Sequence, residues 1–307
     1  LQKEFPDRPE RLFLVGGSWR AIARIDMERR GYPLKVLHEY RMSRKDIRDT
    51  IKYIDAADLD ELRDRTGTSA ERMRLVPLAA LVLKELVNRV KPDEVAVSSY
   101  GIREGMLYEQ MSDEQRNRDP LIEAAYMMES LNARMPGFGR ALFKFIEPLF
   151  GSVRPARKRV MRAACLLHDV SWRAHPDYRA EVCFDNATRA NLGALKHGER
   201  VYLGLALLHR YKSSRKGTNF EPLMTLLAEK DQREAEILGR AMRFGAMFTL
   251  ERPQDHGALK LYPKKGILQL TLRSKMGRDL FSEVAQARFE ALAQAIGADP
   301  VVKHKQR

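Results

Sequence analysis

Two glycine-rich turns in the first third of the chain follow predicted strands, an arrangement that suits the binding of an anion. Before the first turn, residues 11–15, which are apolar after Arg11, predict a buried strand that leads into Gly16 and Gly17, and residues 18–27 have the composition of a helix. Glycines let a ligand approach the backbone closely, and the free N–H groups at a helix start attract anions. We therefore expect Gly16, Gly17 and Ser18 to hold phosphate, although a tight turn without a ligand would show the same glycines.

The second turn, Gly101 to Gly105, follows another apolar strand at residues 94–98 and precedes a helix-like run. Within this turn, Arg103 could hold a phosphate or form an ion pair with a neighbouring carboxylate. Two such turns at strand ends indicate a cleft.

His168 and Asp169 are adjacent at the end of a predicted helix, residues 160–167, and such a pair is the core of HD-type phosphohydrolase metal sites. The other ligands of such a site are missing from the pattern. No histidine lies between His38 and His168, and residues 243–246 contain no aspartate. We therefore expect the pair to form hydrogen bonds inside its domain, with a metal-dependent HD-type phosphohydrolase as the alternative.

The chain has a large excess of positive charge, with a formal net charge of +14 and a sequence pI near 9.8. Such a charge attracts polyanions, including polyphosphate, phosphorylated nucleotides and nucleic acid. Spaced arginines and lysines suit a chain of phosphates, because many modest contacts add up. Trp172 and Tyr211 could stack bases, so RNA is an alternative ligand, and a solvated basic surface is the third interpretation. The residues that we expect to form a polyanion track are His175, Arg179, Arg210, Lys212, Arg215 and Lys216.

Cysteine content and hydrophobicity favour the cytosol. The 307 residues include two cysteines, Cys165 and Cys183, and Cys165 lies in an apolar run that is typical of a buried thiol. No apolar stretch approaches the roughly 18 residues of a membrane span, and no secretory signal opens the sequence. Because the first residue is Leu1 rather than methionine, we expect further residues upstream.

Apolar periodicity, capping residues and helix breakers predict the remaining elements. Residues 40–54 have the pattern of a helix with Ser43 as its N-cap, and residues 75–90 that of a helix after Ser69. Residues 112–248 are almost wholly helical in pattern. The carboxyl-terminal part is predicted to be a small α/β domain with strands at 258–262 and 267–272, a helix at 279–295 and a last strand at 301–302.

Three segments are informative when taken together. They are Val-Gly-Gly-Ser-Trp-Arg-Ala-Ile-Ala from Val15, Glu71-Arg72 before an apolar helix, and Val97-Ser98 followed by Gly101-Ile102-Arg103-Glu104-Gly105. With these segments the chain resembles the exopolyphosphatase/guanosine pentaphosphate phosphatase family. This family usually has threonine where the chain has Ser18 and a small residue where it has Trp19.

The resemblance extends over nearly the whole chain and implies an α+β multidomain fold. It implies part of the second lobe of an actin-like (ribonuclease H-like) ATPase fold for residues 1–111. It also implies an all-helical HD-like domain for residues 112–250 and a small α/β domain for residues 251–307.

The resemblance further implies an enzyme that hydrolyses phosphoanhydride bonds and releases terminal phosphate from inorganic polyphosphate or guanosine pentaphosphate. Mg²⁺ (or Mn²⁺) would be its cofactor, and the enzyme would be a cytoplasmic homodimer. The family's helical domain resembles an HD fold whose metal site has decayed, which matches His168 and Asp169. The family's catalytic glutamate would lie upstream of Leu1, so we assign no general base here and expect this chain alone to be inactive. A non-catalytic module that binds polyanions or RNA is a further alternative.

Overall fold

The computed structural model describes residues 9–304 of the chain. The chain divides between Asn117 and Arg118 into two compact units, and we call Leu1–Asn117 unit 1 and Arg118–Arg307 unit 2. Within the described residues, no helix combines the length and the apolar character that crossing a membrane requires.

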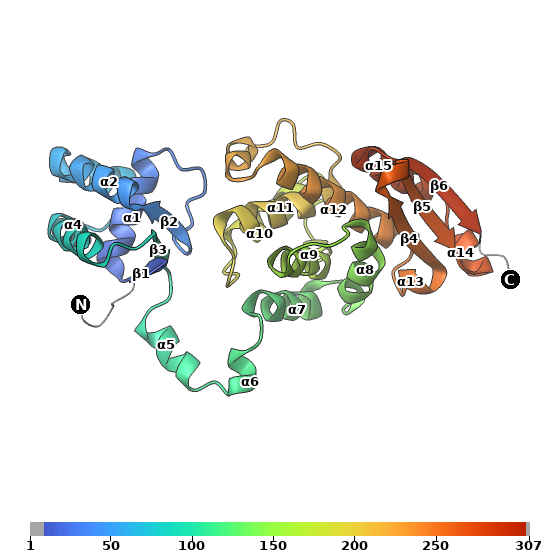
Figure 1. Ribbon diagram of the computed structural model, residues 1–307, viewed down its shortest axis with the longest axis horizontal. Coiled ribbons are helices and arrows are strands. Elements are labelled where there is room, and N and C mark those ends of the chain that lie inside the picture. Colours follow the sequence, from blue (N-terminus) through green and yellow to red (C-terminus); the bar gives the residue numbers. More distant parts are fainter. Residues whose placement is uncertain (1–8, 305–307) are drawn as a thin grey trace. The chain divides into compact units, whose positions relative to one another are not determined.

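Unit 1 contains a three-stranded sheet in the order β1-β3-β2 (Figure 1). The two predicted strands are present as β1 (Arg11–Val15) and β3 (Glu94–Ser98), which pair in parallel with Val15 opposite Ser98. The prediction that the first of them is buried was wrong, because only Leu14 of its five residues is buried. Because these strands are parallel, their carboxyl ends lie side by side, and both glycine turns begin at this end of the sheet. The third strand, β2 (Tyr40–Ser43), pairs antiparallel with β3.

The prediction of one helix over residues 40–54 was wrong. The first four of these residues form β2, in which alternate side chains are buried, and α2 (Arg44–Ala56) begins only after Ser43. The predicted N-cap is confirmed, because the Ser43 hydroxyl accepts a hydrogen bond from the Asp46 backbone N–H and the Asp46 carboxylate accepts one from the Ser43 N–H. The cap therefore marks a junction between a strand and a helix.

Helices cover the face of the sheet on which Leu14 and Val97 are buried. On the other face, the edge strand β1 carries Phe13 and Val15, and both side chains are exposed. The helices that share the core are α1 (Gly17–Arg29), α2, α3 (Leu59–Thr66) and α4 (Ala70–Val90).

Two short helices end unit 1. They are α5 (Ile102–Glu109) and α6 (Asp113–Arg116), and neither contains a buried residue. The second glycine turn therefore opens a helix that is exposed on all sides within its own unit.

The helical part of unit 2 is built around α11 (His197–Tyr211), which is buried along most of its length. α10 (Arg179–Arg189) and α12 (Glu229–Phe248) pack against it. A Cβ atom on Gly239 of α12 would lie 2.4 Å from the carbonyl oxygen of Ala206 on α11, so only glycine permits this approach. The remaining elements are α7 (Pro120–Asn132), α8 (Phe138–Ile146), the 3₁₀ helix η1 (Glu147–Leu149), α9 (Pro155–Leu167) and the 3₁₀ helix η2 (Glu221–Leu226).

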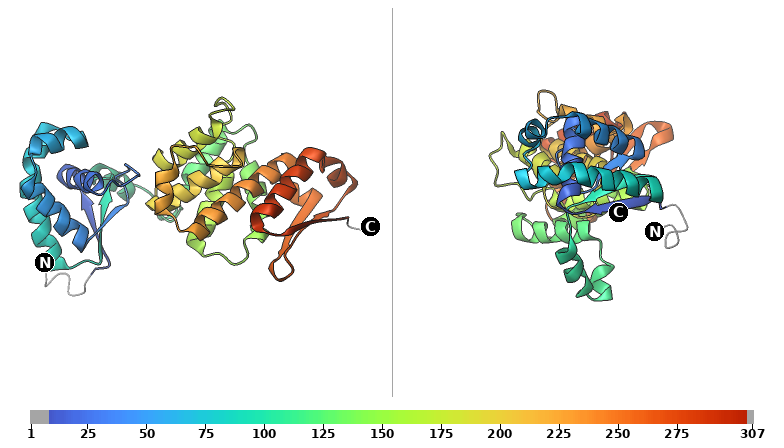
Figure 2. Two further views of the ribbon diagram at one scale, coloured as in Figure 1. Left: turned by 90° about the horizontal axis from the view of Figure 1, so that it is seen from above. Right: turned by 90° about the vertical axis from the view of Figure 1, so that its left-hand side faces the viewer.

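A second three-stranded sheet follows the helices in unit 2 and consists of β4 (Gly257–Tyr262), β5 (Ile267–Leu272) and β6 (Asp299–His304), in the order β4-β5-β6 (Figure 2). β4 pairs antiparallel with β5, as the alternating pattern predicted, and β5 pairs in parallel with β6. The helix α15 (Glu283–Ile296) packs against α12 through Phe289 and Phe244, whose ring centroids are 5.4 Å apart. The elements are α13 (Pro253–His256), β4 (Gly257–Tyr262), the 3₁₀ helix η3 (Pro263–Lys265), β5 (Ile267–Leu272), α14 (Lys275–Leu280), α15 (Glu283–Ile296) and β6 (Asp299–His304).

The predicted helix at residues 279–295 is in fact two helices. α14 ends at Leu280, and Ser282 is the N-cap of α15, where its hydroxyl accepts a hydrogen bond from the Ala285 backbone N–H at 3.4 Å. A serine N-cap stabilises a new helix start, which explains the break. A boundary between two domains near residue 250 remains a prediction.

Candidate functional site

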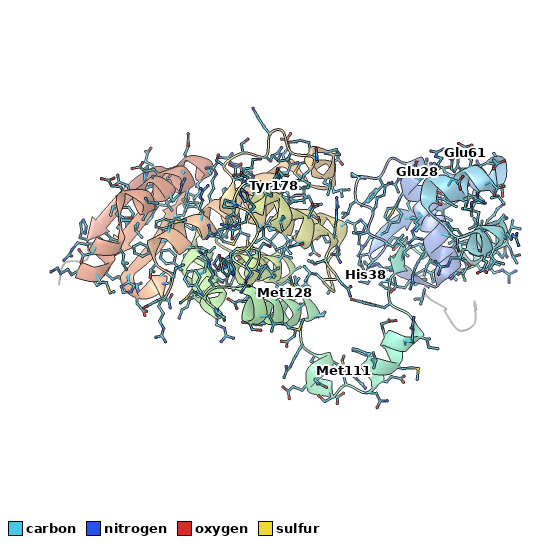
Figure 3. The ribbon with its side chains drawn as sticks, turned by 180° about the vertical axis from the view of Figure 1, so that it is seen from behind. Glu28, His38, Glu61, Met111, Met128 and Tyr178 are labelled. Carbon is cyan, nitrogen blue, oxygen red and sulfur yellow. The ribbon has the colours of Figure 1, made fainter. Side chains whose placement is uncertain are left out.

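The two glycine turns of unit 1 are tied together by a single side chain. Arg20, on the first turns of α1, donates hydrogen bonds from Nε to the Ser98 carbonyl oxygen at 3.1 Å and from Nη2 to the Ser99 carbonyl oxygen at 2.9 Å. His38 (Figure 3) supports the same segment, because its Nδ1 accepts a hydrogen bond from the Ser99 N–H at 3.3 Å. The start of α1 and the end of β3 are therefore held at a fixed distance from each other.

The first turn has the geometry that an anion requires. Gly16 has φ +132° and ψ 166°, a backbone conformation that residues with a side chain rarely adopt. α1 starts directly afterwards at Gly17, with neither a side-chain cap nor an acidic residue in its first turn. Ser18 follows and is half-buried. The N–H groups at this helix start therefore remain available to an anion, which the helix dipole also favours.

Arg72 lies beside this turn. A Cβ atom on Gly17 would be 3.4 Å from Arg72 Nε, and the Arg72 side chain is exposed on α4. A guanidinium group next to free helix N–H groups is a common phosphate-binding arrangement. Arg72 entered the sequence analysis only as part of a motif, and Arg20 was missed as a connecting residue. Nothing in the spacing of either residue signals these contacts, because they form across the fold.

The second turn is occupied differently. Its N-cap is Gly101, whose N–H donates to Glu104 Oε2 at 2.6 Å. This hydrogen bond, together with the charges of Arg103 and Arg20, holds the pKa of the Glu104 carboxyl below its ordinary value. A carboxylate of the chain itself therefore fills the anion position at the start of α5, and the exposed Arg103 lies beside that carboxylate rather than beside a free helix end.

In unit 2, His168 and Asp169 are both buried and both engaged by protein groups. His168 Nδ1 lies 2.8 Å from the Cys165 carbonyl oxygen. Burial, with a smaller effect of the Arg210 charge, puts the pKa of His168 well below its ordinary value, so this ring is neutral near pH 7. Asp169 accepts hydrogen bonds from Arg134 Nε at 2.9 Å and Nη2 at 2.6 Å. Arg134 was not identified from the sequence.

The structure brings two of the expected track residues to this pair. The guanidinium groups of Arg179 and Arg210 lie 5.6 and 4.8 Å from the centroid of the Tyr211 ring. The Tyr211 hydroxyl in turn donates to the His168 carbonyl oxygen at 2.8 Å. Burial raises the pKa of Tyr211 to about 12, so the hydroxyl keeps its proton. Together with Arg134, Asp169 and His168, these residues form what we call the Tyr211 cluster.

The expected polyanion track is wrong in one respect, because Arg210 is only 4% exposed and cannot lie on an open surface. The pattern misled because Arg210 is followed by a polar, basic loop, although α11 itself is enclosed. The remaining residues of the expected track occupy the surface or its margin. Three of them form ion pairs: His175 with Asp177 at 3.5 Å, Lys212 with Glu181 at 3.7 Å, and Arg215 with Glu221 at 3.3 Å. Arg179 follows Tyr178 (Figure 3) at the start of α10, and Lys216 is exposed.

Among the described residues, no cluster of metal-ligating side chains gathers around His168 and Asp169. Residues 9–304 include no group of three or more histidine, cysteine, aspartate or glutamate side chains placed to bind a metal ion. At the His168–Asp169 pair, the Arg134 guanidinium occupies the carboxylate that a metal would need. The pair therefore does not fit a resident Mg²⁺ or Mn²⁺.

Two family models match the chain. The family model described as exopolyphosphatase, C-terminal, matches residues 121–301, and the model of the Ppx/GppA phosphatase family matches residues 1–114. A search of curated proteins found no match to the chain. Since the two family models together span both units, the chain belongs to the Ppx/GppA phosphatase family.

Proposed function

We propose that this chain binds the terminal phosphates of inorganic polyphosphate or guanosine pentaphosphate for exopolyphosphatase-type hydrolysis. The observation that carries the proposal is the uncapped start of α1 at Gly16 to Ser18, with Arg72 beside Gly17 and Arg20 fixing the neighbouring turn. Family membership supports a phosphatase activity in general, and the geometry of this turn supports the phosphate group as its ligand.

The chemistry that such a site contributes is positioning and charge neutralisation. In phosphoryl transfer, the protein holds the phosphate in line for attack by water and stabilises the negative charge of the transition state. The backbone N–H groups at Gly17 and Ser18 and the guanidinium of Arg72 would do this here. We assign no general base to the described residues. Mg²⁺ or Mn²⁺, which the family resemblance implies, would be carried largely by the substrate phosphates and would help to neutralise their charge.

For unit 2 we propose an HD-like helical domain whose metal site has been replaced by protein contacts. The Arg134–Asp169 ion pair and the Cys165–His168 contact support this proposal. We further propose that the protein acts as a homodimer in the cytosol. The two free and buried cysteines, Cys165 and Cys183, fit a reducing compartment.

The proposal is tested by titrating the 307-residue chain with tripolyphosphate in a calorimeter. Arg72→Gln removes the charge beside Gly17 and should weaken binding about tenfold, or roughly 1.4 kcal/mol. Arg74→Gln is the matched control, because Arg74 is exposed on the same helix and has no contact with the turn in the described structure. Equal binding by the wild type and Arg72→Gln would contradict a phosphate site at this turn.

A second measurement separates hydrolysis from simple polyanion binding. Phosphate release is measured with long-chain polyphosphate and with guanosine pentaphosphate as substrates. In a separate experiment, single-stranded RNA competes with polyphosphate for binding to the chain at two salt concentrations. Retention of polyphosphate at a salt concentration that removes RNA supports a phosphate-specific site, since non-specific binding depends steeply on salt. If RNA competes equally at both salt concentrations, the chain is a general polyanion-binding module. We expect the chain alone to bind phosphate chains with little or no hydrolysis.

A further inference from the structure

A cavity of about 390 Å³ lies beside α1 in unit 1. Ligand-binding cavities in proteins typically enclose roughly 300 to 1,000 Å³, so this cavity has room for a small ligand. Its wall is formed by the second half of α1, the loop that follows α1, the end of α3 and the residue after β3. The charged residues of the wall are Arg24, Glu28, Lys35 and Arg65, and Ser99 also lines the cavity.

The wall carries more positive than negative charge, with three cations and one carboxylate among its described residues. The carboxylate is Glu28 (Figure 3), which lies 3.6 Å from Lys35 Nζ and 3.2 Å from Arg65 Nη2. Arg65 also pairs at 3.5 Å with Glu61, one turn earlier on α3. Arg24 is half-buried and makes no hydrogen bond or ion pair in the described part of the chain. The third cation of the wall therefore has no counter-charge.

An anion is the ligand that these side chains favour. A guanidinium without a partner offers paired N–H donors to a phosphate or a carboxylate. Lys35 and Arg65 share the carboxylate of Glu28, and each has further N–H donors for a second acceptor. The wall can therefore bind an anion without breaking the ion pairs that it already contains.

The cavity lies along the same face of α1 as the first glycine turn. Gly17, Arg20 and Arg24 have the spacing i, i+3 and i+7, which places them on one face of a helix. Arg24 lies about 10 Å beyond Gly17, because each helical residue advances about 1.5 Å. Between them, Arg20 donates to the carbonyl oxygen of Ser99, and Ser99 belongs to the cavity wall. An anion in the cavity can therefore belong to the same molecule as a phosphate at the turn.

We propose that Arg24, Lys35 and Arg65 form a second phosphate subsite, which binds a substrate phosphate remote from the terminal phosphate at the first glycine turn. The subsite rests on the proposed function for the position of the terminal phosphate, whereas the cavity and its charge are independent of that function. The second phosphate is either a later unit of a polyphosphate chain or part of the 3′-diphosphate of guanosine pentaphosphate.

The test measures the binding of two pairs of probes to the 307-residue chain by calorimetry. One pair is tripolyphosphate and long-chain polyphosphate, and the other is GTP and guanosine pentaphosphate. Tripolyphosphate is shorter than the two turns of α1 that separate Gly17 from Arg24, and GTP lacks the 3′-diphosphate. Each pair therefore contains a shorter probe that supplies phosphate only to the turn and a longer probe that supplies it to both places.

Arg24→Gln removes the cation that has no partner, and the absence of contacts makes a loss of folding unexpected. The variant should weaken binding of the longer probe of at least one pair about tenfold, while the shorter probe changes by less than about twofold. A loss confined to one pair identifies the source of the second phosphate. Arg74→Gln is the matched control, because Arg74 is exposed on α4 and does not line the cavity. Unchanged binding of both longer probes overturns the proposal, as does an equal loss for shorter and longer probes.

Glu28→Gln separates the subsite from a structural role, because the expected effect has the opposite sign. The substitution removes a negative charge from the cavity and frees Lys35 and Arg65 for the anion. The affinity for the longer probe should therefore rise about threefold. A general disturbance of the fold would lower the affinity, so an unchanged or lower affinity in this variant overturns the proposal.

Failure of the function proposed for the glycine turn gives a different pattern. In that case Arg72→Gln leaves the binding of all four probes unchanged, whereas Arg24→Gln still weakens binding of a longer probe. If the turn binds phosphate and the cavity does not, Arg72→Gln weakens binding of all four probes and Arg24→Gln weakens none.

Discussion

Arg134 holds both carboxylate oxygens of Asp169, with Nη2 at 2.6 Å from Oδ1 and Nε at 2.9 Å from Oδ2. This ion pair joins the segment after α7 to the segment after α9, which lie 35 positions apart in the chain. Burial alone would raise the pKa of Asp169, but the hydrogen bonds from Arg134 hold it below its ordinary value, so the carboxylate is charged. A histidine–aspartate pair that is typical of metal sites is thereby used for a contact within the protein.

We expect Asp169→Asn to destabilise unit 2 by about 2 kcal/mol, because the substitution removes two charge-assisted hydrogen bonds and leaves Arg134 without a counter-charge. Urea denaturation measures the loss. Asp177→Asn is the control, because Asp177 is exposed in the following loop and should change stability by less than about 0.5 kcal/mol.

Metal analysis of the same proteins decides between this interpretation and an HD-type metal centre. We expect no stoichiometric manganese or iron in the purified wild type, since a metal ion would have to displace Arg134 from the carboxylate. Bound metal that disappears in Asp169→Asn would instead support a metal-dependent phosphohydrolase.

Asp26 is the centre of a buried polar network in unit 1. Its side chain is fully buried and accepts hydrogen bonds from the Tyr40 hydroxyl at 2.7 Å, the Thr50 hydroxyl at 2.6 Å and Arg29 Nη2 at 2.8 Å. We expect Asp26→Ala to cost about 3 to 5 kcal/mol of stability, because it leaves several buried donors without an acceptor. The paired variant Asp49→Ala, on the exposed side of α2, should have little effect. Similar losses in the two variants would show that the network contributes no special stability.

Glu129 gives the stability of unit 2 a pH dependence of defined sign. It is 2% exposed and accepts a hydrogen bond from the Gly139 N–H at 2.8 Å, and burial raises its pKa above the ordinary 4.5. Below pH 4.5 the carboxyl is protonated in both the folded and the unfolded chain. As the pH rises above 4.5, the unfolded chain releases the proton more readily, so the folded state loses stability until the pH exceeds the folded pKa.

The measurement for Glu129 is the unfolding free energy of the wild type and Glu129→Gln between pH 4 and pH 7. We expect the glutamine variant to gain relative to the wild type as the pH rises, by about 1.4 kcal/mol for each unit of pKa displacement. Parallel curves for the two proteins would contradict a raised pKa at this site.

The sequence was sufficient for elements that are marked by local pattern. The apolar runs at Arg11–Val15 and Glu94–Ser98 end in glycine or polar turns, and both are strands in the structure. Tyr40–Ser43 was missed, because four residues that include an arginine show their strand character only through pairing with β3. The burial of Arg210 could have been inferred, since α11 is apolar on all its faces between Val201 and Leu208 and such a helix is normally enclosed.

Side-chain partners were out of reach for a different reason. Arg20 and Ser98 are separated by 78 positions, and Gly17 meets Arg72 only because α1 and α4 share one core. Spacing along the chain encodes neither contact. The glycine turn was thus predictable as a feature, while the arginines that give it a charged surrounding became visible only in the fold.

Gly16 allows the backbone geometry of the turn to be tested separately from its charge. At φ +132° an alanine is strained, so Gly16→Ala should destabilise unit 1 by about 1 to 3 kcal/mol and turn the first N–H groups of α1 away from a bound phosphate. Gly31→Ala is the matched control, because Gly31 also has a positive φ, of 57°, and lies in the turn after the opposite end of α1 with open space around its Cβ position. Both variants should lose stability, measured by urea denaturation, but only Gly16→Ala should lose affinity for tripolyphosphate. Equal affinity in the two variants would mean that the turn is a structural junction and that phosphate is held elsewhere in the chain.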